Sequence, residues 1–417
     1  MILTSIFRVI LSRSFKPFIF QGKPNEPMAD YNVPQLGAYV HIPFCEKICS
    51  FCPYNKVLYE KELADVYVDA LLKEIDLVGQ KQTQKKEITS IYFGGGTPAL
   101  VVEKLEAIIN KIKLYFSIQD GVAIELHPDN INEKLLEQLK KAGVDMISVG
   151  VQSFDEGCLK KLGRAPDHVS DKIKMVKSYG FRVIDVDLIF GIPSQTKKTL
   201  IADFNHAFEC GATQISTYPF IDFSYANNAH KPINGIRKKK MLDCLVKNSE
   251  EMGVQRTSVW TFAQKGTQQY SSVTRENFLG FGASATTLLK DQFKINTFVV
   301  EEYIKASQDN KMPTALVLDF TPRQRQLYWL FWSAYNMFLH EASFEKLFEK
   351  KLNKEFGIEI ALSKLLGLLK KVDGGYVLTH RGAYLFHFIE QAYTTAYIDK
   401  MWRIARNQSY PNKVVLR

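Results

Sequence analysis

The sequence predicts an α/β protein in which a partial (β/α) barrel is followed by a smaller helical, winged-helix-like domain. Short β-prone apolar runs alternate with amphipathic stretches between residues 37 and 265, a pattern typical of a parallel sheet with helices outside it. At least six such units are present, which indicates a full or partial barrel rather than a small open sheet. A chain of 417 residues is long enough for two or three domains.

The barrel elements follow from the hydrophobic periodicity of the sequence. The expected strands are apolar runs at 38–42, 88–93, 123–126, 146–151, 183–190, 214–220 and 257–262. The expected helices are amphipathic stretches at 61–79, 101–115, 131–142, 167–179, 197–209 and 236–252. The carboxyl ends of parallel barrel strands meet at one end of the barrel, and barrel proteins build their active sites there.

The pattern changes after about residue 300. Residues 322–373 read as mostly helical, and Asp373-Gly374-Gly375 separates two β-prone runs, which predicts a hairpin. Helices followed by a hairpin are typical of a winged-helix-like domain. We therefore expect four parts: an N-terminal segment at 1–36, a barrel core at 37–265, a connection with a glycine motif at 266–310 and a C-terminal domain at 311–417.

The composition is that of an ordered globular protein, with 46% hydrophobic and 24% charged residues, so wholesale disorder is excluded. Lys and Arg outnumber Asp and Glu by 54 to 44, a net charge of +10. This excess favours anionic partners without choosing among carboxylate-rich substrates, nucleic acid and membrane surfaces, and a solvated basic surface explains it equally well. No helix carries a dense Lys/Arg stripe, so nucleic acid is not an expected partner.

The N-terminal segment has no Asp or Glu in its first 25 residues. Its apolar runs are too short for a transmembrane segment. A segment docked on the fold, an amphipathic membrane-surface helix and an organelle transit peptide remain open, and docking is favoured because Pro17, Pro24 and Pro27 interrupt any long helix.

The clearest functional signal is a cysteine cluster with the spacing C-x3-C-x2-C, formed by Cys45, Cys49 and Cys52 just after an expected strand. The other three cysteines, at positions 158, 210 and 244, are scattered and are expected to be small buried apolar residues. So few cysteines in a long chain predict a reduced, cytoplasmic protein with one cysteine site.

Three thiolates in one loop can each bind a different iron of a 4Fe-4S cluster. An all-cysteine cluster uses four ligands, so one iron would stay open to chelate the amino and carboxylate groups of S-adenosylmethionine (SAM). The alternative is a zinc site that adds His41 to the three cysteines. Structural zinc sites prefer paired ligands separated by a long loop, so this alternative is weaker.

Several motifs occur in a specific order between Tyr39 and Gly282: YVHIPFC-x3-C-x2-C, FGGGTP, GVQSF, LGR, DLIFGIP and LGFGASA. With them the chain resembles the radical SAM superfamily and, more closely, the oxygen-independent coproporphyrinogen III oxidase-like (HemN-like) family. The resemblance implies a partial barrel covered by a C-terminal domain, a 4Fe-4S cluster on the three cysteines and cleavage of SAM to a deoxyadenosyl radical. It also implies a reducing electron donor such as flavodoxin or ferredoxin.

The resemblance also implies which residues contact SAM. Gly95 and Gly96 end a strand, and we expect their missing side chains to let the backbone approach SAM closely. A carboxylate such as Glu125 is costly to bury in a strand unless it is paired, and Arg164 or the SAM amine are its expected partners. Asp187 is expected at the ribose hydroxyls, with Asp185 paired nearby. The full expected set is Tyr39, Phe51 at the adenine, Gly95, Gly96, Thr97, Glu125, Gln152, Arg164, Asp187, Ile221 and Thr286. Members of the oxidase subgroup bind two SAM molecules, so the set is expected to serve one site or two.

Two departures from the family pattern leave the substrate open. The oxidases carry a further cysteine where this chain has Tyr54, and the HNxxYW motif of the related haem chaperones is absent from the stretch QQYSSVTREN at 268–277. The leading expectation is a small-molecule substrate of the tetrapyrrole class, a porphyrinogen whose propionate side chain is oxidatively decarboxylated. The alternatives are a radical C-methyltransferase or cyclopropanating enzyme, a non-catalytic haem-binding carrier, and a winged-helix protein with a structural metal.

Overall fold

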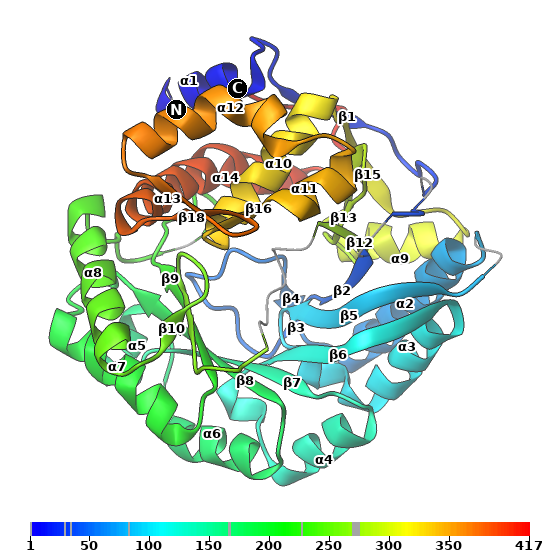
Figure 1. The fold of residues 1–417 in the computed structure, drawn as a ribbon. Helices are drawn as coiled ribbons and strands as arrows, with labels where there is room; N and C mark the ends of the chain where they lie inside the picture. Colours follow the sequence, from blue (N-terminus) through cyan, green and yellow to red (C-terminus); the bar gives the residue numbers. More distant parts are fainter. Residues whose placement is uncertain are drawn as a thin grey trace.

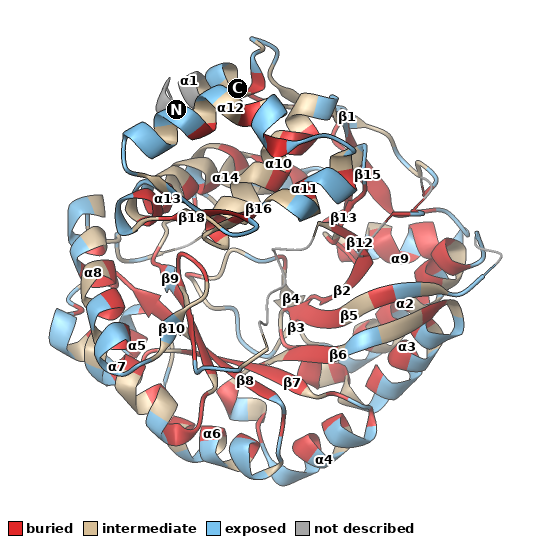
Figure 2. Ribbon diagram, in the orientation of Figure 1, coloured by how far each residue is buried: buried red, intermediate tan, exposed pale blue. Residues whose placement is uncertain are grey.

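One sheet of 14 strands organises the protein, in the order β10-β11-β9-β8-β7-β6-β5-β2-β12-β13-β14-β15-β1-β19 (Figure 1). The computed structural model describes residues 2–28, 31–33, 36–81, 84–165, 168–226, 228–268 and 276–417. The sheet curls but does not close on itself, because β10 and β19 are its two edges. Buried residues follow the strands and the inward faces of the helices (Figure 2).

The predicted partial barrel is confirmed. Its strands pair parallel in the order β2 (Leu36–Ile42), β5 (Lys86–Gly95), β6 (Phe116–Leu126), β7 (Met146–Gln152), β8 (Val183–Phe190) and β9 (Gln214–Pro219). The helices on its outside are α2 (Lys61–Gly79), α3 (Val102–Tyr115), α4 (Glu133–Lys141), α6 (Val169–Ser178), α7 (Lys197–Cys210) and α8 (Gly235–Glu251) (Figure 1). Each lies within a few residues of its predicted position because its apolar residues recur at the helical period.

The strand predicted at 257–262 is wrong in detail. The chain forms two short strands here, β10 (Gln255–Arg256) and β11 (Thr261–Ala263), and β11 pairs antiparallel with β9. The Ser258 hydroxyl accepts hydrogen bonds from the backbone N–H groups of Trp260 and Thr261, at 3.3 and 3.0 Å. This serine-centred turn reverses the chain, so the parallel run of the sheet ends at β9.

The sheet continues across the connection predicted at 266–310. Strand β12 (Asn277–Phe281) pairs parallel with β2. Antiparallel pairing then adds β13 (Thr286–Leu288), β14 (Gln292–Asn296), β15 (Thr314–Asp319), β1 (Phe18–Gly22) and β19 (Lys413–Leu416). These strands have only three to six residues, too few for an alternation of polar and apolar residues to stand out, so sequence periodicity misses them.

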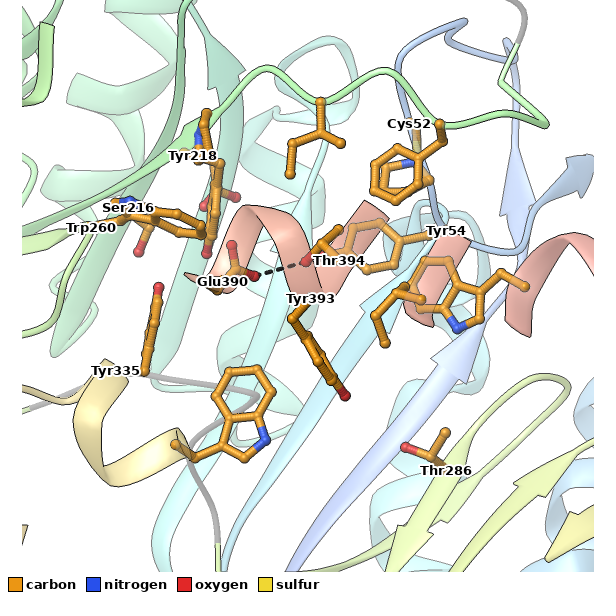
Figure 3. Close-up of a pocket in the computed structure, with 18 of the residues that line it drawn as sticks. Cys52, Tyr54, Ser216, Tyr218, Trp260, Thr286, Tyr335, Glu390, Tyr393 and Thr394 are labelled. Atoms are coloured by element: carbon orange, nitrogen blue, oxygen red, sulfur yellow. Dashed lines mark hydrogen bonds between the residues drawn. The ribbon is translucent and has the colours of Figure 1, made fainter. Parts of the chain in front are cut away.

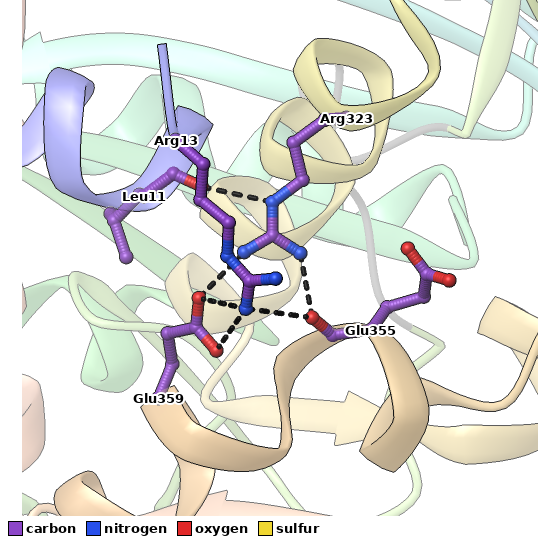
Figure 4. Close-up of polar contacts among 5 residues, drawn as sticks. All are labelled: Leu11, Arg13, Arg323, Glu355 and Glu359. Carbon is purple, nitrogen blue, oxygen red and sulfur yellow. Dashed lines mark hydrogen bonds and ion pairs between the residues drawn. The ribbon is translucent and has the colours of Figure 1, made fainter.

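The N-terminal segment packs on the fold, in agreement with the prediction based on its prolines. Helix α1 (Ile2–Ser12) contacts α10 (Pro322–Tyr335) and α13 (His380–Tyr393). Arg323 holds the end of this helix by donating to the Leu11 carbonyl at 2.9 Å and to Glu359 at 2.6 Å (Figure 4). Arg13 pairs with the same carboxylate at 3.1 Å. None of the helices in the described ranges has the length and apolar content needed to cross a bilayer.

The predicted hairpin and winged-helix-like order are present in the C-terminal part. The elements are α10, β16 (Phe338–His340), α11 (Glu341–Phe348), α12 (Leu352–Leu365), β17 (Leu369–Val372) and β18 (Gly375–Leu378), with the sheet order β16-β18-β17. The turn residue Gly374 has a φ of 78°, which favours glycine. Helix α13, a π-helical turn (Thr394–Ile398) and α14 (Asp399–Asn407) follow. In Figure 1 these helices face the open side of the barrel.

A buried carboxylate ties the barrel to the antiparallel half of the sheet. Glu74 on α2 accepts hydrogen bonds from the Gly282 N–H, the Asn296 amide and the Tyr303 hydroxyl, each at 2.7 Å. Gly282 follows β12, Asn296 ends β14, and Tyr303 lies on α9 (Val300–Gln308). Burial raises the pKa of Glu74 to about 7. Its three donors therefore converge from three separate elements on one side chain.

We predict that Glu74→Gln lowers the free energy of unfolding by about 1–3 kcal/mol. The substitution replaces one acceptor oxygen by an NH2 group, which is itself a donor and faces donors that then lack an acceptor. Urea unfolding followed by circular dichroism measures this loss. The control is Asp69→Asn, exposed on the same helix, which should stay within about 0.5 kcal/mol. Equal stability of the two variants would show that Glu74 does not stabilise the contact between the barrel and the antiparallel half of the sheet.

Candidate active site

A cavity of about 1240 Å³ lies between the carboxyl ends of the barrel strands and the C-terminal helices (Figure 3). The structure brings every residue of the expected set to its wall: Tyr39, Cys45, Cys49, Phe51, Cys52, Gly95, Gly96, Thr97, Glu125, Gln152, Arg164, Asp187, Ile221 and Thr286. These residues come from the ends of successive strands of the sheet, far apart in the sequence. Their meeting follows from the parallel barrel, whose strand ends share one rim.

The cysteine loop is clamped at its base. Cys45 ends the short strand β3 (Phe44–Cys45), which pairs with β4 (Val57–Leu58) on the far side of the loop. The Tyr59 N–H donates to the Cys45 carbonyl at 2.9 Å. Cys49 and Cys52 pack against an apolar cluster that includes Phe51 and Cys158. The loop therefore presents its three thiols from a fixed base beside an apolar wall.

The three thiols of the loop are free, as cluster ligands must be before iron binds. Burial raises the pKa of Cys45 to about 11, so iron binding at this residue has to displace a proton. Among the residues that the structure describes, no group of three or more His, Cys, Asp or Glu side chains is arranged to hold a metal ion. A 4Fe-4S cluster does not require the thiols to converge on one point, because each thiolate binds a different iron.

The glycine motif has a second physical reason besides the expected one. A Cβ on Gly96 would lie 2.4 Å from the Phe44 carbonyl oxygen, and one on Gly95, at a φ of 117°, would lie 2.6 Å from the His41 ring. The Gly96 N–H donates to the Ile42 carbonyl at 2.8 Å. Both glycines are thus required by close packing against the start of the cysteine loop, and not only by an approach to SAM.

His41 is fully engaged within the protein. Its Nε2 lies 3.0 Å from the Asn55 carbonyl oxygen and its Nδ1 lies 2.9 Å from the Tyr39 hydroxyl. A carbonyl only accepts, so Nε2 carries the proton and Nδ1 accepts from Tyr39. Burial lowers the pKa of His41 to about 4, which keeps the ring neutral. Both ring nitrogens are occupied, so the zinc alternative lacks its fourth ligand at this residue.

Three carboxyl groups form the floor of the cavity. Glu125 accepts from the Tyr92 hydroxyl at 2.7 Å and from the Gly95 N–H at 3.2 Å. Asp187 accepts from a serine hydroxyl of β7 at 2.9 Å. Asp185 is paired nearby, as expected, with a serine hydroxyl of β9 at 2.8 Å. The expectation that Arg164 pairs with Glu125 is wrong, because a tyrosine and a backbone N–H take that place.

Burial raises the pKa of all three acids, to about 6 for Asp185 and well above the ordinary value for Asp187. For Asp187, repulsion from Asp185 and Glu125 adds to the effect of burial. A positively charged ligand would relieve this repulsion, because it favours the ionised form of each neighbouring acid. The floor is therefore suited to a cation.

Arg164 lies beside the carboxylate floor, near Asp187, with part of its hydrogen-bonding capacity unused. It donates to the Gly150 carbonyl and lies 5.5 Å from the centre of the Phe51 ring. Its Nε is buried without a partner. Gln152, at the end of β7, has a φ of 72° where the register with β8 shifts, and such strained backbone gathers at functional sites. An anionic group beside Arg164 would satisfy its free N–H.

The C-terminal wall of the cavity carries residues that sequence reasoning missed. Tyr54 faces Trp402, with ring centres 6.0 Å apart. Tyr335, Glu390 and Tyr393 also line the cavity (Figure 3). No motif marks these positions; the one signal was a glutamate at a core-facing position of α13. The stretch at 268–277 lies mostly outside the described residues.

A partial barrel with a cysteine triad in its first loop and a covered cavity defines a class of iron–sulfur proteins. The family model of the radical SAM superfamily matches residues 39–207. HemW, the heme chaperone of Bacillus subtilis, is 28% identical over 373 residues, which cover 84% of this chain and 96% of that protein. The oxygen-independent coproporphyrinogen III oxidase of Synechocystis is 24% identical over 426 residues, covering 92% and 90%.

The solved structure of the Escherichia coli coproporphyrinogen III oxidase HemN has the same fold, with a TM-score of 0.75 at 21% identity over 93% of this chain and 98% of that one. The chain thus matches the radical SAM superfamily over its barrel core, and over most of its length it is similar to HemN and HemW. The superfamily implies a 4Fe-4S cluster and SAM.

We predict that Gly96→Ala lowers the iron bound after anaerobic reconstitution several-fold, because its Cβ would displace the Phe44 carbonyl and the cysteine that follows. Iron and sulfide analysis measures the change. Gly357→Ala is the control, since a Cβ there meets nothing within 4 Å, and it should bind full iron. Full iron in Gly96→Ala would show that the cysteine loop does not depend on this packing.

Proposed function

We propose that the protein is a radical SAM enzyme that removes a hydrogen atom from an organic substrate held in the cavity. Cys45, Cys49 and Cys52 are the proposed cluster ligands. The observation that carries the proposal is the meeting of this cysteine triad with the glycine motif and the carboxylate floor around one covered cavity. Bound together, the cluster and SAM supply a deoxyadenosyl radical that can attack unactivated C–H bonds.

The side chains present fit the parts of SAM. The unpartnered Nε of Arg164 suits the SAM carboxylate, since arginine recognises carboxylates by paired hydrogen bonds. Glu125 and Asp187 suit the positive amine and sulfonium and the ribose hydroxyls. Phe51 offers an aromatic face for adenine. The covered cavity keeps bulk water from the reacting atoms.

Two further proposals concern partners. Ile221 follows β9, whereas Thr286 begins β13 on the other side of the parallel run, and this arrangement supports a division of the expected residues between two SAM molecules. A reducing donor such as flavodoxin or ferredoxin supplies the electron. The net charge of +10 supports an acidic donor of this kind, because opposite charge steers encounter.

The porphyrinogen reaction rests on the names of relatives and on the charge of the chain. The Synechocystis relative is a coproporphyrinogen III oxidase. In the step proposed for this chain, the deoxyadenosyl radical takes a hydrogen atom from the β-carbon of a propionate side chain. The substrate radical then gives one electron to a one-electron acceptor and releases CO2, which leaves a vinyl group. Tyr54 weighs against completion of that step, since a phenol cannot relay electrons as a thiolate does. A C-methyltransferase or cyclopropanating reaction uses the same core.

A haem carrier is the second candidate, and it is supported by the similarity to HemW of Bacillus subtilis. A carrier would give a haem Soret band and no SAM cleavage. The enzyme would cleave SAM when reduced, with or without haem. Absorption spectra and deoxyadenosine analysis on one reconstituted sample separate the two candidates.

We predict that replacing any one of Cys45, Cys49 or Cys52 by Ala abolishes reductive cleavage of SAM, measured as deoxyadenosine by chromatography. Cys158→Ala and Cys210→Ala are the controls. Both thiols are buried, at 2% and 1% exposure. Cys210 lies on α7, outside the apolar cluster beside the cysteine loop, whereas Cys158 lies in that cluster without being an assigned ligand. Both variants should therefore retain cleavage and iron. Loss of iron in Cys210→Ala with retention in Cys49→Ala would contradict the assignment.

We predict that Asp187→Asn weakens SAM binding roughly 10- to 100-fold, the value of one hydrogen bond to a charged group. Equilibrium dialysis with labelled SAM measures the affinity, and iron content should be unchanged. Asp185→Asn, on the same strand and already paired with a serine, should change the affinity far less. An unaltered affinity in Asp187→Asn would place this residue outside the SAM site.

A further inference from the structure

The two halves of the cavity wall differ sharply in chemistry. The barrel half carries the cysteines, the three acids and most of the basic residues. Residues 276–417 contribute mostly aromatic and aliphatic side chains, and Glu390 is the one charged side chain among them. Helix α1 adds Leu11, Thr4 and Arg8. A ligand that reaches beyond the cysteine loop therefore meets an apolar chamber with one carboxyl group in its wall.

The basic groups on the wall all lie in the N-terminal and barrel parts of the chain, and none comes from residues 276–417. Lys56 donates to the Cys52 carbonyl at 2.6 Å, and Arg8 donates to the Lys16 carbonyl at 2.5 Å. Arg164 donates to the Gly150 carbonyl. Binding several carboxylates against this wall would require several cations, because an unpaired buried charge is costly. The wall formed by residues 276–417 therefore offers no cation to a carboxylate-rich substrate.

Glu390 has an unused hydrogen-bond acceptor. The residue is 9% exposed. Its Oε1 accepts from the Thr394 hydroxyl at 2.9 Å, and its Oε2 is buried without a partner (Figure 3). Its charge acts on the neighbouring Tyr335 and Tyr393. A buried acceptor without a donor is destabilising unless a ligand supplies one.

Glu74 provides an internal comparison. Burial raises the pKa of both glutamates to about 7, so both lie in similarly dehydrated sites. Glu74 receives three hydrogen bonds and does not line the cavity, whereas Glu390 receives one and lines it. The fold therefore satisfies the structural glutamate and leaves the cavity glutamate short of donors.

Local backbone geometry points the same way. Thr394, the donor to Glu390, begins the π-helical turn Thr394–Ile398, and Tyr397 and Ile398 of this turn also line the cavity. Single π-helical turns are rare and occur frequently at functional sites, because they reposition side chains at a cost to the helix. Here the turn begins four residues after Glu390, about one helical turn away, and shapes the wall beside it.

We propose that the substrate is a predominantly apolar molecule with one hydrogen-bond donor, an N–H or O–H group. Glu390 is the substrate-positioning residue, and its carboxylate accepts the hydrogen bond from this group. This inference rests on the proposed function, since the donor would hold the substrate for hydrogen abstraction at the cysteine side of the cavity. It replaces a tetracarboxylate porphyrinogen by an apolar ring or chain compound as the substrate class.

The first test compares stability in the substrate-free holoenzyme. Replacing an unpaired buried carboxylate by an apolar side chain of similar size is neutral or stabilising, so Glu390→Leu should keep or raise the thermal midpoint. Glu74→Leu should lower it by at least about 4 °C. A drop in Glu390→Leu equal to that in Glu74→Leu would assign Glu390 a structural role and overturn the proposal.

The second test measures ligand selection with the neutral dye Nile red, whose binding quenches Trp260, Trp332 and Trp402 on the cavity wall. Decanol should displace the dye better than decyl methyl ether, which has no donor, by roughly 10-fold or more. Glu390→Leu should abolish this preference. Glu390→Gln keeps a neutral acceptor at this position and should retain the preference for decanol over the ether. Equal displacement by decanol and the ether in the unmodified protein would overturn the proposal.

Coproporphyrinogen III, deuterated at the propionate β-carbon, separates this inference from the proposed function. Deoxyadenosine formed without substrate supports the proposed function whatever the ligand results. Deuterium in deoxyadenosine, with displacement of Nile red by the porphyrinogen, would overturn the apolar substrate and leave the radical SAM function standing. If neither the unmodified protein nor any variant forms deoxyadenosine, the proposed function is refuted. The Nile red displacement then still tests which class of ligand the cavity binds.

Discussion

The close contact between the glycine motif and the cysteine loop is the constraint on which the site depends. The N–H groups of Gly96 and Thr97 donate to the carbonyls of Ile42 and Phe44, at 2.8 and 2.7 Å, and thereby extend the pairing of β2 and β5 beyond the ends of both strands. Only glycine leaves room for this contact. The first cysteine of the triad is fixed by it, and so is the distance between the triad and the carboxylate floor.

Dehydration of acidic groups is the common physical theme of the molecule. The barrel floor gathers three acids whose mutual repulsion a cationic ligand would relieve. Glu74 is dehydrated to the same degree but is neutralised by donors of the fold itself. Glu390 stands between these cases, with one donor from the protein and one acceptor left over. Hydrogen-bond partners together with position on the cavity wall, rather than burial alone, distinguish Glu74 from Glu390.

Sequence reasoning located the barrel side of the cavity because its residues lie in contiguous motifs at strand ends. It could not locate the C-terminal wall, whose aromatic residues look like ordinary core residues of amphipathic helices. The pairing of Phe18–Gly22 with Lys413–Leu416 joins segments too distant in sequence for any local signal. The partner of Glu125 was misjudged, because the choice between Arg164 and Tyr92 depends on side-chain reach across the barrel and not on spacing along the chain.

The pairing of β1 with β19 has a consequence for biogenesis. The cysteine loop leaves the ribosome early, whereas the wall that covers it is made roughly 340 residues later, a delay of roughly 20–70 s at ordinary rates of synthesis. Strand β1 cannot gain its neighbour β19 until that wall is complete. The nascent chain therefore exposes its thiols to cluster-assembly machinery through an open barrel mouth.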